Sequence, residues 1–94
     1  MRILEKIGMC ASYKGYCYWE EAISIVKKSR KDKINMTNIY IKIAEKYGEK
    51  YTAVERNMAR ALEKVKNIEQ KLNVDYELTT KKALILLANK EKGE

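Results

Sequence analysis

Apolar residues recur three and four positions apart along most of the chain, and this period constrains the fold more than any other feature. In residues 15–28 the apolar face consists of Tyr16, Tyr18, Trp19, Ala22, Ile23, Ile25 and Val26. We interpret the two tyrosines as core residues rather than as a stacking surface for bases. The 94 residues contain no proline and no strand-like alternation of apolar and polar residues. The sequence therefore predicts an all-α fold of about five helices in one domain, residues 1–94.

Glycines and capping side chains set the expected helix bounds. The expected helices are a short one before Gly8, one from Gly15 to about Lys28, one from Asn35 or Thr37 to Gly48, one from Thr52, and one from Thr79 or Thr80. Ile68 and Leu72 continue the apolar stripe of Val65 without a glycine break, so the fourth helix is expected to extend to Leu72. In the third helix the expected inner stripe is Met36, Tyr40, Ile43, Ala44 and Tyr47.

The chain is basic, with a net charge of +7, and the excess lies in residues 1–66. This charge favours an anionic partner, with nucleic acid first and an acidic membrane surface second. No stretch approaches the ~18–20 apolar residues of a membrane span, so we expect a cytoplasmic protein without a membrane partner. Residues 27–33 contain five basic side chains and one acidic one. They are interpreted as a solvated loop, as a contact to DNA phosphates, or as both.

The residue types needed for a metal centre or for catalysis are sparse. The chain has two cysteines, Cys10 and Cys17, and no histidine. Four metal ligands cannot be assembled from these thiols alone, and we expect both to be reduced. Without histidine, a glycine-rich phosphate loop or a plausible pair of carboxylates, we expect no enzyme, no cofactor and no metal.

Residues 40–66 have the spacing of a helix-turn-helix. Such a unit needs a small residue inside its first helix, a glycine four positions later and an aliphatic residue six beyond that. Ala44, Gly48 and Val54 supply these three positions, although Glu49 stands where an apolar residue is common. Many helical hairpins would satisfy this pattern, which alone is moderately specific.

The second helix of this unit separates an apolar side from a basic one. At 100° per residue the apolar side holds Val54, Met58, Ala61, Leu62 and Val65. The opposite side holds Ala53, Arg56, Arg60, Glu63 and Lys64, with Asn57 near the arginines. Thr52 and Glu55 are expected to form a capping box at its start. The side with Arg56 and Arg60 either reads base edges in a DNA groove or is an ordinary solvated face.

These blocks, taken together, resemble a known family. They are Lys14-Gly15-Tyr16 with Tyr18, Glu21-Ala22-Ile23, Ile39-Tyr40, Ile43-Ala44-Glu45-Lys46-Tyr47 and Val54-Glu55-Arg56. They resemble the effector domain of stage 0 sporulation protein A, the DNA-binding half of a sporulation response regulator. The resemblance runs from about Ile3 to Leu72 and resumes more loosely from Thr79 to Lys92.

The resemblance implies a helical domain that reads short promoter boxes, often as two adjacent domains. It implies base-contacting roles for Glu55 and Arg56 and makes Thr52 a substitute for a serine that caps the helix and binds phosphate. Ala53 and Ala59 stand where the family has arginines, and Arg60 stands where it has a histidine. If Met1 is the natural start, the chain lacks the family's receiver domain, and phosphorylation within it cannot switch it.

The leading hypothesis is a sequence-specific transcription regulator that binds double-stranded DNA through the helix starting near Thr52. The expected DNA-binding residues are Lys50, Thr52, Ala53, Glu55, Arg56, Asn57, Arg60 and Lys64. A single copy, a homodimer and a tandem pair on DNA are all left open. The alternative is an interaction or antagonist protein that binds a full-length relative instead of DNA.

Overall fold

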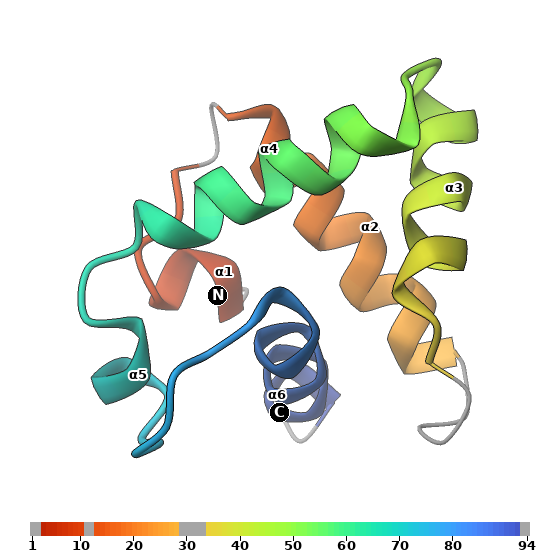
Figure 1. Ribbon diagram of the computed structural model, residues 1–94. Coiled ribbons are helices and arrows are strands. Elements are labelled where there is room, and N and C mark those ends of the chain that lie inside the picture. Colours follow the sequence, from red (N-terminus) through yellow and green to blue (C-terminus); the bar gives the residue numbers. More distant parts are fainter. Residues whose placement is uncertain (1–2, 11–12, 29–33, 93–94) are drawn as a thin grey trace.

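The regular structure is helical throughout the part of the chain that the computed structural model describes, residues 3–10, 13–28 and 34–92 (Figure 1). The described helices are α1 (Ile3–Lys6), α2 (Lys14–Lys28), α3 (Met36–Tyr47), α4 (Tyr51–Glu63), α5 (Ile68–Lys71) and α6 (Thr80–Lys92). The all-α prediction is confirmed. Residues 29–33, most of the predicted basic loop, lie outside the described residues.

Helix α2 is the central element of the core. It packs against α3, α4 and α6, and α4 also packs against α3 (Figure 1). Trp19 and Ala22 of α2 are fully buried, and Tyr16 and Tyr18 are nearly so. The two tyrosines are therefore core residues, as predicted, and do not form a stacking surface for bases.

The helical period identified the core faces well, with one error in α3. The predicted apolar side of α4 is buried along its length. In α3, however, Tyr47 was predicted to be buried and is 42% exposed. Ile39, which was not in the predicted stripe, is buried. Tyr47 is in the last turn of α3, where its ring packs edge-to-face on Tyr18 with 5.3 Å between ring centroids. The ring covers the rim of the core instead of entering it.

The crossing of α2 and α4 depends on Gly15 and Trp19. A Cβ atom added to Gly15 would lie 2.5 Å from the backbone oxygen of Asn57 and 2.7 Å from the Cβ of Ala61. One turn further, the buried indole N–H of Trp19 donates a 2.9 Å hydrogen bond to the carbonyl of Met58. These contacts fix α4 against α2 at backbone distance, and so determine which side of α4 faces solvent.

Substitution Gly15→Ala tests this close approach. It is expected to lower the free energy of unfolding by about 1–2 kcal/mol, because overpacking costs ~1–3 kcal/mol and exceeds the ~1 kcal/mol that alanine gains over glycine in a helix. Urea unfolding followed by circular dichroism measures the change. Ser24→Ala in the same helix is the control, and should be neutral or slightly stabilising. A Gly15→Ala protein as stable as the wild type would contradict the crossing geometry.

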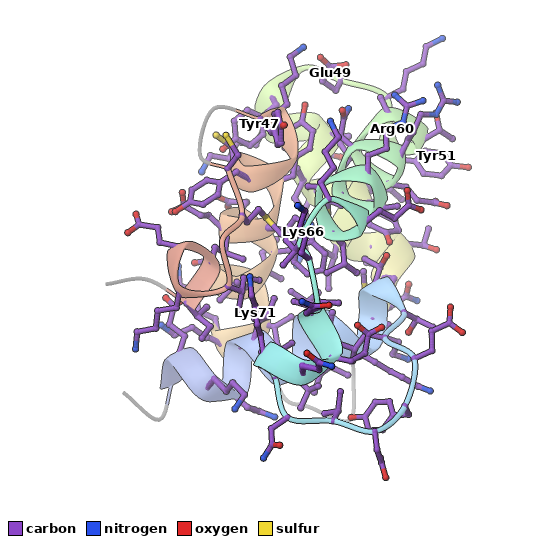
Figure 2. All side chains as sticks on the ribbon, turned by 90° about the vertical axis from the view of Figure 1, so that its left-hand side faces the viewer. Tyr47, Glu49, Tyr51, Arg60, Lys66 and Lys71 are labelled. Atoms are coloured by element: carbon purple, nitrogen blue, oxygen red, sulfur yellow. The ribbon has the colours of Figure 1, made fainter. Side chains whose placement is uncertain are left out.

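The expected extension of α4 to Leu72 is wrong. Helix α4 ends at Glu63, and the chain turns at Asn67, which adopts the left-handed conformation with φ 55°, before the short helix α5. Asparagine adopts this conformation more readily than other non-glycine residues, so no glycine is needed for the break. The Lys71 ammonium of α5 then donates to the Ile7 carbonyl at 2.9 Å (Figure 2). Ile68 and Leu72 are buried as the stripe predicted, but from a separate helix.

Candidate nucleic-acid interface

Helices α3 and α4 form the predicted helical pair. Ala44 is buried where the two helices approach each other, and Val54 is fully buried on α4. Gly48 ends α3 with φ 67°, and the following N–H of Glu49 donates to the Ala44 carbonyl at 2.9 Å. This left-handed position favours glycine. The three positions that identify a helix-turn-helix therefore occupy the places that the pattern requires.

The expected capping box at the start of α4 is wrong. The N-cap is Lys50, whose carbonyl accepts hydrogen bonds from the N–H groups of Ala53 and Val54. Thr52 is already inside the first turn, so its hydroxyl cannot act as the N-cap group. The Lys50 side chain makes no capping hydrogen bond, and the first turn of α4 contains no acidic residue. The positive end of the helix dipole is therefore open to an external anion.

The predicted DNA-binding residues lie on α4, at its N-cap and at its C-cap. Six are exposed: Lys50, Thr52, Glu55, Arg56, Arg60 and Lys64. Ala53 and Asn57 are half-buried. Figure 2 looks along α4 from its C-terminal end and shows Arg60 on the side turned away from α6. We call the surface formed by Ala53, Arg56, Arg60 and Lys64 the outer face of α4.

The two arginines of the outer face are not neutralised by the rest of the described chain. Within residues 3–10, 13–28 and 34–92, neither guanidinium forms an ion pair or a hydrogen bond. By contrast, Lys46 pairs with Glu21 at 2.7 Å and Lys27 pairs with Glu91 at 3.5 Å. The donors of Arg56 and Arg60 are therefore available to a partner.

Two of the predicted residues have neighbours that limit what they can do. The Asn57 amide donates to the carbonyl of Ala53 at 2.8 Å, so one of its donors is used within α4. Glu55 lies on the flank of α4 near Tyr40. Burial raises the pKa of the Tyr40 phenol, the Glu55 carboxylate raises it further, and a hydrogen bond with the Thr80 hydroxyl opposes them. Glu55 is thus set to one side of the outer face.

A depression of about 180 Å³ adjoins the other flank of α4, where α2 begins. We call it the flank pocket, and its lining residues are Tyr13, Lys14, Gly15, Asn57, Arg60, Ala61 and Lys64. The Lys64 ammonium lies 4.3 Å from the centroid of the Tyr13 ring. Sequence reasoning did not include Tyr13 or Lys14 among the site residues. The only signal was the Lys14-Gly15-Tyr16 block, because helical period cannot show that this segment lies beside α4.

Other kinds of site are not found among the described residues. No three histidine, cysteine, aspartate or glutamate side chains in this part of the chain are placed to hold a metal ion. No helix in the same residues is long and apolar enough to cross a membrane. Cys10 and Cys17 are exposed, and neither is part of a disulfide. Among the described residues, the outer face of α4 and the flank pocket together present the positive side chains of Lys14, Arg56, Arg60 and Lys64.

Comparison with known families agrees with this geometry. A family model described as the C-terminal domain of the sporulation initiation factor Spo0A matches residues 1–87. No curated protein and no solved structure matches the chain significantly. The match covers α1 to α5 and more than half of α6, including the helix-turn-helix. The chain therefore belongs to the Spo0A C-terminal family, and this membership implies a sporulation-related DNA-binding effector domain.

Proposed function

We propose that this protein is a sequence-specific transcription regulator domain of the cytoplasm that inserts the outer face of α4 into the major groove of DNA. The observation that carries the proposal is the pair of arginines, Arg56 and Arg60, exposed on the second helix of a helix-turn-helix and free of ion pairs within the described residues. An arginine fork matches the two acceptors of guanine in the major groove, and each such pair is worth ~1–3 kcal/mol of discrimination.

The dimensions and side chains of α4 suit this role. A helix is ~10–12 Å wide and the major groove is ~12 Å wide, so one helix fills the groove. Ala53 adds little bulk between the arginines and the helix start, which permits close approach. Arg56 points opposite the buried side of α4 by helical period and is the best-placed residue to reach a base edge. Glu55 lies on the flank toward Tyr40, and we propose that its carboxylate accepts a hydrogen bond from a cytosine amino group.

The start of α4 is suited to bind the DNA backbone. At this end the N-cap side chain makes no hydrogen bond and the first turn has no acidic residue, so the positive end of the helix dipole can face an anion. Lys50 and Thr52 are exposed beside it. Helix N-termini bind phosphate through backbone N–H groups and the helix dipole. We infer that Lys50 and Thr52 hold one DNA strand while Lys64 holds a phosphate at the other end of the outer face. These contacts orient the helix and carry no sequence information themselves.

Selection of bound duplexes from a random pool tests the proposal. We expect enrichment of a short box that contains guanine. A single box indicates one copy on DNA, and a repeated box indicates a tandem pair or a dimer. An unenriched pool would contradict sequence-specific recognition, and binding only to a full-length relative would support an antagonist instead.

Salt dependence gives a second, independent prediction. The logarithm of the binding constant should fall linearly with the logarithm of salt concentration. Phosphate contacts by Lys50 and Lys64 should give a slope of about −2 or steeper. Fluorescence anisotropy with the selected duplex measures this slope. A slope near zero would show that phosphate contacts are absent.

A further inference from the structure

The flank pocket has an electrostatic property that the helix-turn-helix alone does not explain. Three cationic side chains, Lys14, Arg60 and Lys64, line one depression, and no carboxylate is among its lining residues. Lys14 comes from α2, Arg60 comes from α4 and Lys64 is the C-cap of α4, so the packing of the two helices creates this concentration of charge. Like charges held together repel one another, and a bound anion relieves that repulsion.

Among the described residues, the carboxylate that pairs with one of these three cations is that of Glu49, and the pair is exposed. Glu49 pairs with Lys14 at 3.6 Å, and the Lys14 side chain is 72% exposed. Exposed pairs of this kind contribute ~0–1 kcal/mol and are readily exchanged for another anion. Lys14 can therefore turn from Glu49 to an anion in the pocket at little cost.

The remaining lining residues shape the pocket for a small anion. Gly15 and Ala61 are in close contact, since a Cβ atom on Gly15 would lie only 2.7 Å from the Ala61 Cβ, and this approach of α2 to α4 brings their cationic side chains to one depression. The Lys64 ammonium is held 4.3 Å from the ring centroid of Tyr13, and this contact restricts its position before any ligand binds. Helix α2 starts at Lys14 with no acidic residue in its first turn, so its dipole adds positive potential on the same side.

We propose that the flank pocket binds one backbone phosphate of the DNA whose major groove α4 enters. The side chains of Lys14, Arg60 and Lys64 contact this phosphate. This inference rests on the proposed function. A helix in the major groove has a phosphate backbone along each flank, and the pocket lies directly on one flank of the outer face. Arg60 then acts on the backbone, and Arg56 is left as the base-reading arginine.

The test compares Lys14→Gln, Lys64→Gln and the double variant with the wild type. Anisotropy is measured over a range of salt concentrations with the selected duplex and with a scrambled duplex. The double variant should lose the same factor of affinity for both duplexes, and the magnitude of its salt slope should fall by about one. Lys90→Gln on α6 removes one charge from an exposed site away from α4 and should leave the slope unchanged. Thermal melting verifies that each variant is folded.

A matched experiment distinguishes a DNA phosphate from free phosphate. Inorganic phosphate, compared with chloride at equal ionic strength, should weaken duplex binding by the wild type and not by the double variant. If phosphate binds the pocket without competing with the duplex, the pocket is a free-anion site and the proposal is overturned. Loss of specificity alone in the double variant, or a slope change no larger than that of Lys90→Gln, also overturns it. In these cases the proposed function stands, because the wild type still selects its box.

Discussion

Replacing Arg56 and Arg60 together with alanine is expected to weaken binding to the selected duplex at least about 30-fold. Losing a base-reading arginine costs ~1–3 kcal/mol, loss of the second cation adds to this, and ~2 kcal/mol corresponds to the stated factor. Both side chains are exposed and unpaired within the described residues, so their removal leaves no buried group without a partner. The fold should therefore remain intact, and anisotropy measures the affinity directly.

The two single variants, Arg56→Ala and Arg60→Ala, should differ in their effect on sequence specificity. Arg56→Ala is expected to lower the preference for guanine in the box, whereas Arg60→Ala should weaken binding to all duplexes alike. The control is the double variant Lys81→Ala and Lys90→Ala, which removes two exposed charges from α6. It should weaken binding far less than the arginine double variant. Unchanged affinity after loss of both arginines would exclude the outer face of α4 as the DNA contact.

Substitution Trp19→Ala is expected to have the largest effect on stability. Removing a buried tryptophan costs ~3–5 kcal/mol, and loss of its hydrogen bond to the Met58 carbonyl adds ~0.5–1.5 kcal/mol, because that carbonyl lies inside α4 and keeps its helical partner. Because small domains are stable by only ~5–15 kcal/mol, the variant should be largely unfolded at room temperature. Urea titration followed by circular dichroism at the helical band measures this. A cost below about 1 kcal/mol would mean that Trp19 does not join α2 to α4 as described.

Trp19→Phe separates the hydrogen bond from the bulk of the ring. Phenylalanine retains much of the buried volume but has no N–H donor, so its cost should lie between that of the wild type and that of Trp19→Ala. If Trp19→Phe remains folded, its affinity for the selected duplex shows whether the hydrogen bond to Met58 is needed to orient α4 for DNA binding. If it is needed, affinity for the selected duplex should fall together with stability.

The helical period and the turn glycine were sufficient to predict most of the fold. Apolar residues three and four apart identified the buried sides of α2 and α4, because a buried helix face must follow that spacing. Gly48 marked the turn, because few residues tolerate its left-handed backbone. These features are local, and a sequence records them directly.

The errors came from choices that are not local. Thr52 was expected to cap α4, but the chain leaving Gly48 already places the Lys50 carbonyl at the helix start. The break at Asn67 was missed because apolar period continued across it, and the period does not distinguish one long helix from two short ones. Tyr47 had the spacing of a core residue but lies in the last turn, beyond the end of the core.

The candidate site was predictable only where it lies on a single helix. Arg56, Arg60 and Lys64 share a side of α4 by their spacing, and the structure leaves that side accessible. Lys14 lies more than forty residues away from Arg60 in the chain, and both line the flank pocket only because Gly15 allows α2 to approach α4 closely. The spacing of apolar residues within each helix does not indicate that Lys14 and Arg60 lie close together. A contact between distant segments requires the packed structure.

The central claim is that Arg56 reads a guanine edge from the major groove, and modified bases test it most directly. Replacing each guanine of the selected box in turn with 7-deazaguanine removes an acceptor in the major groove, whereas inosine removes only the amino group in the minor groove. We predict that one deazaguanine position weakens binding by the wild type but not by Arg56→Ala, and that inosine at that position has little effect. Sensitivity to inosine alone, or equal sensitivity of the wild type and Arg56→Ala to deazaguanine, would contradict the claim.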